Sequence, residues 1–223
     1  MTDLASDTSD PIPAPDLRWR LVVPVKGAPD AKSRLELDRE AARLDLARAM
    51  ALDTVEAALT SHAVEVVLVV TSDVPVASAA AAAGARVESD PGAGLNAAVC
   101  HGRDVLAAES DGPVAILLAD LPAVRPDDLT DALRVCAQHR SAFVPDTEGS
   151  GTVLLSALHA RDLLPDFGPG SATRHARIAW RLDLDLARLR RDVDLVSSLD
   201  AAVELGVGPR TAAALAARPR AAG

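Results

Sequence analysis

Apolar runs and amphipathic segments alternate along the first two thirds of the chain. Residues 19–25, 66–70 and 114–119 form short runs with few polar side chains, which is typical of strands that are buried on both faces of a sheet. The segments that follow these runs carry apolar residues at helical spacing. This alternation predicts an α/β fold of three layers, α/β/α, in which a mostly parallel sheet with right-handed crossovers lies between helices.

The same patterns place the other elements of this region. A short strand is predicted before the loop that begins at Asp90, and Gly84 stops the helix that precedes this strand. The predicted strand covers residues 86–89, and the predicted helices cover residues 38–59, 76–83, 95–109 and 126–140.

Beyond residue 141 the pattern is less regular. Two strands are predicted at 142–145 and 152–158, with a Gly-rich turn between them. Leucine and aspartate alternate over 182–186, which predicts a half-exposed strand. Residues 190–193 predict a further strand with an acidic end, and two helices, one of them at 199–205, close the chain.

The composition fits one domain with an aliphatic core. The chain has 223 residues, of which 49% are hydrophobic, but it contains only two Phe, two Trp and no Tyr. Residues 1–16 are rich in Ser, Asp and Pro and are predicted to be a disordered tail, whereas residues 17–223 are predicted to form a single domain.

Charge and hydropathy argue against two classes of partner. The formal net charge of −9 and the scarcity of aromatic residues disfavour binding to a nucleic acid. The N-terminus lacks the features of a signal peptide, and no apolar run approaches the length of a membrane span. We therefore expect a cytoplasmic protein with no membrane partner.

Acidic residues at predicted strand ends provide the first candidate chemistry. Asp120 directly follows the run 114–119, and Asp192 and Asp194 lie at the end of the predicted strand 190–193. Ligands of open parallel sheets bind beyond the carboxyl ends of the strands. Mg²⁺ usually takes one or two carboxylates together with phosphate oxygens of the substrate, so these acids predict a Mg²⁺ site. Ordinary capping of a turn is the alternative, and it explains Asp192 more easily than the other two.

A basic loop follows the first predicted strand. The only two lysines of the chain, Lys26 and Lys32, lie in this loop together with Arg34. An ammonium group is a compact charge that can reach a phosphate oxygen, which favours a polyphosphate ligand. A solvated surface loop is the alternative.

Two loops with glycines provide further candidates. Gly94 and Asn96 lie in DPGAGLNAAV, where backbone amides at a helix start can bind an anion, although a plain tight turn explains the same residues. A second group suits a phosphorylated or carboxylated substrate because it combines hydroxyls, glycine amides and a cation, with an ordinary capped loop as the alternative. Its members are Thr152, Gly168, Ser171, Arg174 and His175.

The segment GVGPRTAAALAA, residues 206–217, resembles a helix-hairpin-helix element that holds a DNA phosphate through glycine amides. It offers an alternative function as a nucleic-acid-binding protein. The net acidity of the chain and the lack of basic clusters beside the segment count against this alternative.

Six motifs occur in order along residues 21–217: VPVKGAPDAKSRL, DPGAGLNAAV, LLADLPAV, GTVLL, FGPGSATRH and DVD. In this order they resemble the phosphoenolpyruvate / 2-phospho-L-lactate guanylyltransferase family of coenzyme F(420) biosynthesis. The resemblance implies a Rossmann-like fold of the nucleotide-diphospho-sugar transferase type. It also implies transfer of GMP from GTP to the phosphate of a small phosphorylated carboxylic acid, with release of pyrophosphate and transfer of the product to a downstream transferase.

The resemblance also implies roles for the candidate residues. Asp120 with Asp194 or Asp192 would hold Mg²⁺, and Asp120, Lys26 and Lys32 would be the catalytic residues. The triphosphate would be neutralised by Lys26, Lys32 and Arg34, and the turn of Gly94 and Asn96 would face the nucleoside. The acceptor would be held by Thr152, Gly168, Ser171 and Arg174.

The chain departs from the family pattern at two positions, and one alternative enzyme class remains. Ser33 stands where the family pattern suggests Thr, which keeps the hydroxyl, and Gly170 stands where related sequences often carry Asp. The choice among phosphoenolpyruvate, 2-phospholactate and 3-phosphoglycerate does not follow from these residues, although the C-terminal GVGPRTA favours phosphoenolpyruvate. A molybdenum-cofactor-type nucleotidyltransferase is the alternative within the same fold, but its Gly-rich first loop is missing here.

Overall fold

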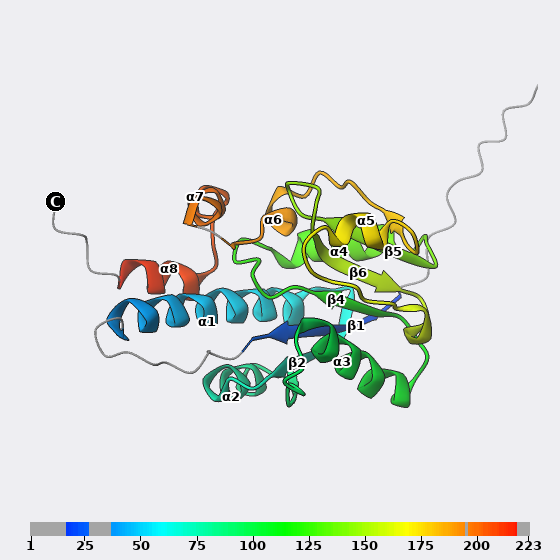
Figure 1. Cartoon of the computed structure of the whole chain (residues 1–223), viewed down its shortest axis with the longest axis horizontal. Helices are drawn as coiled ribbons and strands as arrows, with labels where there is room; N and C mark the ends of the chain where they lie inside the picture. The colour runs from blue at the N-terminus through cyan, green and yellow to red at the C-terminus, as the bar shows by residue number, and fades with distance from the viewer. Residues whose placement is uncertain (1–16, 27–36, 195, 218–223) are drawn as a thin grey trace, which may run out of the picture.

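A computed structural model describes residues 17–26, 37–194 and 196–217 of the chain (Figure 1). Its centre is a sheet in which the described residues form seven strands in the order β3-β2-β1-β4-β6-β5-β7. The strands are β1 (Trp19–Val25), β2 (Val64–Thr71), β3 (Arg86–Glu88), β4 (Val114–Leu117), β5 (Ser141–Pro145), β6 (Thr152–Ala157) and β7 (Trp180–Arg181).

The sheet is mostly parallel, as the alternation of strands and helices predicted. β1 pairs in parallel with β2 and β4, β2 with β3, and β5 with β7. β6 is antiparallel to both of its neighbours, β4 and β5. Because β6 runs in the reverse direction, its first residue, Thr152, lies at the same edge of the sheet as the carboxyl end of β4.

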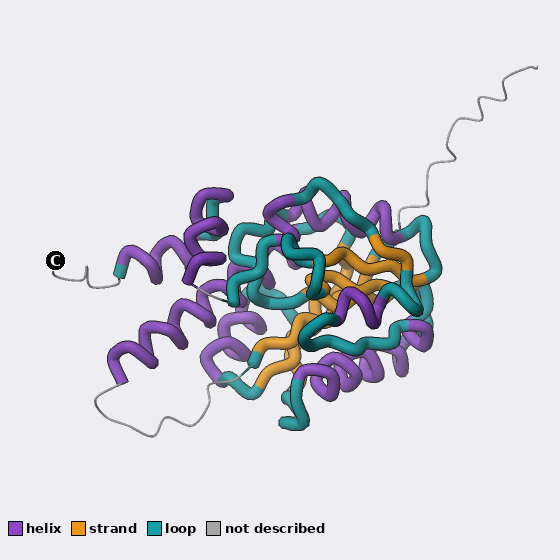
Figure 2. Tube along the Cα trace, turned by 45° about the horizontal axis from the view of Figure 1, so that its top comes forward, coloured by secondary structure: helices purple, strands orange, loops and turns teal. Residues whose placement is uncertain are grey.

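Helices cover both faces of the sheet, so the predicted three-layer α/β/α arrangement is confirmed (Figure 2). One face packs against α1, α2 and α4, and the other packs against α3, η1 and α5. The helices are α1 (Leu37–Thr60), α2 (Val74–Ala82), α3 (Leu95–Glu109), α4 (Pro126–Cys136), η1 (Ala160–Asp162), α5 (Ser171–His175), α6 (Ala187–Arg190), α7 (Val196–Leu205) and α8 (Pro209–Ala216).

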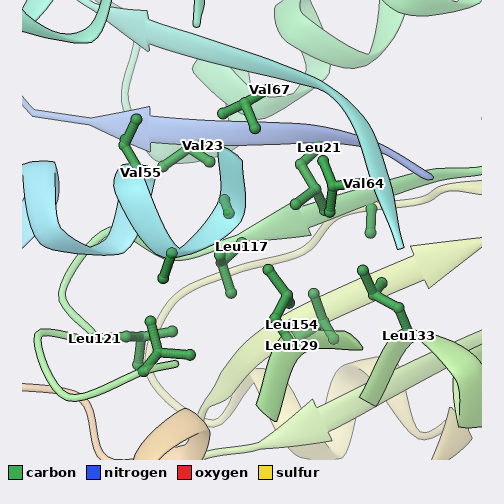
Figure 3. Close-up of a cluster of buried hydrophobic side chains, with 14 of the residues drawn as sticks. Leu21, Val23, Val55, Val64, Val67, Leu117, Leu121, Leu129, Leu133 and Leu154 are labelled. Atoms are coloured by element: carbon green, nitrogen blue, oxygen red, sulfur yellow. The ribbon is translucent and has the colours of Figure 1, made fainter. Parts of the chain in front are cut away.

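The central strand β1 shows why the sequence folds in this way. All seven of its residues are buried, and its apolar side chains are divided between two apolar clusters, one on each face of the sheet. Leu21 and Val23 point into the cluster that includes Val55 of α1 (Figure 3), whereas Val22 points into the cluster that includes Val99 of α3. Both faces of this strand are mostly apolar, so it appears in the sequence as an apolar run that only Arg20 interrupts.

Two expectations for the C-terminal third are wrong. The predicted strand at 182–186 is irregular, and only the two residues of β7 pair with the sheet there. The guanidinium of Arg190 explains this, because it donates hydrogen bonds to the carbonyls of Pro145 and Leu184, both at 3.2 Å, and to that of Asp146 at 3.0 Å. The carbonyls at the end of β5 and in the neighbouring segment thus accept hydrogen bonds from a side chain and not from the backbone of an adjacent strand.

The predicted strand at 190–193 is also wrong. Arg190 is the last residue of the short helix α6, and Asp192 and Asp194 follow it in a loop. The first 16 residues, which were predicted to form a tail, lie outside the described residues. None of the helices in the described ranges combines the length and the apolar character that crossing a bilayer requires.

Candidate active site

A cavity of about 610 Å³ opens at the edge of the sheet where β1 and β4 end and β6 begins. Segments that are distant in the sequence meet around it: the end of β1, helix α1, the residues after β4, the turn before β6, the loop before α5 and the loop after α6. Asp120, Asp192 and Asp194 line it, and so do Lys26 and Thr152. The structure thus brings together residues that the sequence analysis selected separately.

A main-chain hydrogen bond joins the two acidic corners. The amide of Val193 donates to the carbonyl of Asp120 at 3.0 Å, so the loop that carries Asp192 and Asp194 lies directly against the turn after β4. The hydroxyl of Thr54 on α1 also donates to the carbonyl of Ala119 at 3.1 Å. The backbone on both sides of the Asp120 carboxylate is therefore held in place.

The Asp120 side chain has an unsatisfied oxygen. Its Oδ1 atom is buried and has no hydrogen-bond partner among the described residues. Burial is the main cause that raises the pKa of Asp120 to about 6, and the Asp194 carboxylate raises it further, while Lys26 acts in the opposite direction. A buried, negatively charged oxygen without a donor is the kind of ligand that a hard cation takes.

Asp192 lies between other carboxylates. Burial again contributes most to its raised pKa of about 7, followed by Asp120, Asp146 and Asp194. Each of these carboxylates makes the ionised form of the others less stable, and a bound cation would offset this repulsion. Carboxylate oxygens are ligands of hard cations, so the acidic residues of this site fit a divalent metal ion.

Asp146, which directly follows β5, also lines the cavity and was not among the predicted site residues. It accepts hydrogen bonds from the amides of Ser150 at 2.9 Å and Gly151 at 2.7 Å, which fix the turn before β6. Oxygen atoms of Asp146, Glu148 and Asp192 lie within 4.8 Å of one another and form a second acidic group, of which Asp146 and Asp192 line the cavity. The signal that selected Asp120, an acid after an apolar run, was also present at Asp146.

Of the predicted basic group, Lys26 is described. It is exposed, follows β1 and lines the cavity on the side of Asp120. Lys32 and Arg34, which were predicted to bind the triphosphate with Lys26, lie outside the described residues.

Three residues of the predicted acceptor group also line the cavity. Thr152 and Ser171 are buried, and both line the cavity together with Gly168. Gly168 and Gly170 have φ angles of +131° and +72°, which L side chains rarely adopt. The positive φ of Gly170 gives a backbone reason for glycine at this position.

Arg174 does not line this cavity. Its guanidinium donates to the carbonyl of Pro169 at 2.7 Å and to that of Asp166 at 2.9 Å, and it lies 3.0 Å from the Asp166 carboxylate. Arg174 therefore stabilises the loop that carries Gly168 by joining residues on both sides of that glycine.

The second glycine loop also reaches the cavity. The Asn96 side chain donates to the carbonyl of Phe167 at 3.0 Å and accepts from the Phe167 amide at 2.8 Å. Gly94 caps α3 with a φ of +91°, and the next residue, Leu95, lines the cavity. In this structure Asn96 ties the start of α3 to the loop before α5, and its side-chain amide is engaged by that loop.

The C-terminal segment 206–217 docks onto the rest of the domain. The Asp53 carboxylate accepts hydrogen bonds from the amides of Arg210 at 3.1 Å and Thr211 at 2.8 Å, and the amide of Gly208 donates to the carbonyl of Pro122 at 2.8 Å. The amide of Gly206 likewise donates to the carbonyl of Val203 at 3.0 Å, so both glycine amides that would hold a DNA phosphate have acceptors within the molecule. Figure 1 shows the result, with α8 lying alongside α1.

The chain has the Rossmann-like α/β fold of nucleotide-diphospho-sugar transferases. A protein from Desulfovibrio desulfuricans G20 described as a nucleotide-diphospho-sugar transferase shares the fold, with a TM-score of 0.56, 16% identity and coverage of 85% of this chain and 96% of that one. A nucleotidyl transferase from Methanothermobacter thermautotroptrophicus gives a TM-score of 0.55 at 18% identity, over 83% of this chain and 97% of that one.

Sequence comparison identifies the family. Residues 19–197 match the family described as "Guanylyl transferase CofC like". A protein from Streptomyces scabiei (strain 87.22) that is named phosphoenolpyruvate guanylyltransferase is 50% identical over 213 residues, which cover 90% of this chain and 97% of the relative. The chain belongs to the CofC-like guanylyl transferase family, so the resemblance found in the motifs is confirmed and the molybdenum-cofactor alternative is set aside.

Proposed function

We propose that this chain transfers GMP from GTP to the phosphate group of phosphoenolpyruvate, releases pyrophosphate and forms enolpyruvyl-diphospho-guanosine for coenzyme F(420) biosynthesis. The observation that carries the proposal is the carboxylate cluster of Asp120, Asp192 and Asp194 around one cavity, with Oδ1 of Asp120 buried and without a partner among the described residues. The name of the Streptomyces relative supports phosphoenolpyruvate over the other acceptors. The product would then pass to a downstream transferase.

Repulsion between negatively charged groups is the main barrier to binding both substrates at this site. Both substrates carry phosphate groups, so they repel each other and the carboxylates of the site. Asp120, Asp192 and Asp194 would hold Mg²⁺, which when bound supplies positive charge to the phosphate oxygens. Lys26 adds positive charge from the end of β1, and we assign the same role to Lys32 and Arg34.

The chain positions the acceptor for attack. Thr152, Gly168 and Ser171 line the cavity, and they would orient the phosphorylated acid through the Thr152 and Ser171 hydroxyls and the close approach that Gly168 permits. An acceptor phosphate oxygen attacks the α-phosphorus of GTP, and the bond to the pyrophosphate oxygen breaks. The attacking oxygen is already anionic, so the step needs no general base, and catalysis consists of alignment and charge stabilisation.

Pyrophosphate release tests this proposal. The enzyme is incubated with GTP and Mg²⁺ and with phosphoenolpyruvate, 2-phospholactate or 3-phosphoglycerate in parallel, and pyrophosphate is removed enzymatically to draw the reaction forward. We expect turnover with phosphoenolpyruvate and a loss of at least about 100-fold in the Asp120→Asn variant. The exposed Asp185→Asn variant serves as the matched control and should retain the wild-type rate.

Two results would contradict the proposal. No pyrophosphate release with any of the three acids would exclude guanylyl transfer to this class of acceptor. A wild-type rate for Asp120→Asn would exclude the assigned role of the carboxylate cluster.

A further inference from the structure

His175 is fully buried at the end of α5 and does not line the cavity. Both phenylalanines of the chain pack against its imidazole, with the ring centroids of Phe143 and Phe167 at 5.9 Å and 5.1 Å. The packing fixes the orientation of the ring, and both of its nitrogens make hydrogen bonds. The mechanism above does not use it.

The hydrogen bonds of His175 determine where its proton lies. The backbone amide of Asp166 donates to Nε2 at 3.0 Å, so Nε2 must be unprotonated. Burial lowers the pKa of His175 to about 4, so the ring is neutral at physiological pH and carries a single proton. That proton is therefore on Nδ1, and Nδ1 donates to the Thr152 hydroxyl oxygen at 2.9 Å.

This donation determines what the Thr152 hydroxyl can do. Its oxygen already accepts the Nδ1 proton, so its own proton must point away from His175. Thr152 lines the cavity wall on which the acceptor was placed. A hydroxyl oriented in this way is a donor toward an anionic oxygen, and hydrogen bonds to charged acceptors are the stronger kind.

We propose that His175 is a positioning residue that fixes the Thr152 hydroxyl as a hydrogen-bond donor to an anionic oxygen of the phosphorylated acceptor. The proposal rests on the proposed function, because it assigns a ligand to the Thr152 side of the cavity. It gives the buried histidine of FGPGSATRH a role that acts through Thr152 and does not involve contact with either substrate.

The kinetic test uses matched variants at both positions. Thr152→Val removes the donor with little change in shape, Thr152→Ser keeps it, and His175→Gln keeps an acceptor for the Asp166 amide but loses the Nδ1 donor. The KM for phosphoenolpyruvate should rise about 10- to 100-fold in Thr152→Val and about 3- to 10-fold in His175→Gln. The KM for GTP should stay within about twofold, and Thr152→Ser should approach the wild type.

A double-mutant cycle separates positioning from general damage to the fold. If His175 acts through the Thr152 hydroxyl, then the Thr152→Val/His175→Gln variant should have the same acceptor KM as Thr152→Val alone. Effects that multiply would overturn the proposal, and so would an equal rise in the KM for GTP in His175→Gln. His175→Asn, whose amide nitrogen can occupy the place of Nδ1, provides a second variant in case His175→Gln does not fold, and it should be impaired less.

A spectroscopic measurement tests the tautomer without any turnover. In ¹⁵N-histidine-labelled wild-type protein, with the His175 signals assigned from their absence in the His175→Asn spectrum, Nδ1 should show the signature of a protonated nitrogen and Nε2 that of an unprotonated one. The reverse pattern would overturn the role of His175 even in an active enzyme. An enzyme that releases no pyrophosphate with any acceptor, but shows the expected tautomer, would instead contradict the proposed function and the acceptor role of Thr152 with it.

Discussion

Replacing Asp120 by Asn should make the metal-free protein more stable while it removes activity. Burial and the Asp194 carboxylate raise the pKa of Asp120 from its ordinary value of 3.8 to about 6. Since each pKa unit corresponds to about 1.4 kcal/mol, keeping this carboxylate ionised at neutral pH costs the folded state about 3 kcal/mol. Asn has nearly the same shape and no charge, so most of this cost should disappear.

The expected gain is measurable as a shift in Tm. For a chain of this size, about 1 kcal/mol corresponds to about 2 to 4 °C, so Asp120→Asn should unfold about 4 to 10 °C above the wild type in a chelator. The Asp185→Asn control should change the Tm by less than about 1 °C, because its side chain is exposed. Added Mg²⁺ should stabilise the wild type and should have little effect on Asp120→Asn.

The pH dependence gives a second signature of the same effect. An acid whose pKa is higher in the folded chain than in the unfolded chain binds its proton more tightly when folded. The unfolding free energy of the metal-free wild type should therefore fall as the pH rises from about 4 to about 7, and this fall should be smaller in Asp120→Asn. A variant that is less stable than the wild type in the chelator, or that has an unchanged pH dependence, would refute this account of Asp120.

Three further outcomes are expected. Asp53→Ala should lower the unfolding free energy by about 2 to 3 kcal/mol in denaturant titrations, because two amides of α8 lose their acceptor. The exposed control Glu65→Ala should lie within about 0.5 kcal/mol of the wild type. Gly102→Ala should lower the unfolding free energy by about 1 to 3 kcal/mol in the same assay, because the new Cβ would lie 2.5 Å from Cγ1 of Val22. An unchanged unfolding free energy would contradict the close packing of α3 on β1. The apparent affinity for Mg²⁺, measured by calorimetry, should weaken as the pH falls through about 7 and 6, where Asp192 and Asp120 take up protons, and a flat profile would exclude them as ligands.

The first half of the chain could be predicted closely because its signals are local. The apolar run of β1 was predicted with the observed bounds, Trp19–Val25, since a central strand that is buried on both faces is apolar at nearly every position. Asp120 could be selected for a similar reason, because an acid at the end of such a run lies where parallel sheets bind ligands. The motifs then indicated the family without any tertiary information.

The C-terminal third could not be predicted in this way. The leucine and aspartate alternation at 182–186 has the period of a strand, but Arg190 satisfies nearby carbonyls from a position that no local pattern reveals. Asp146 carried the same signal as Asp120, yet its importance depends on the neighbouring Asp192, which follows a helix and not a strand.

By itself, the sequence determined the class of fold, the apolar strands and the acidic and basic residues available for chemistry, because hydrophobic periodicity and residue type are local properties. Only the tertiary structure decided which of them share a site. The reversed direction of β6 places Thr152 beside the end of β4, and one hydrogen bond from Val193 to Asp120 joins two acidic corners that lie far apart along the chain. The tautomer of His175 likewise depends on partners from separate segments, because the donor and acceptor roles of a ring nitrogen are set by the atoms that surround it in space.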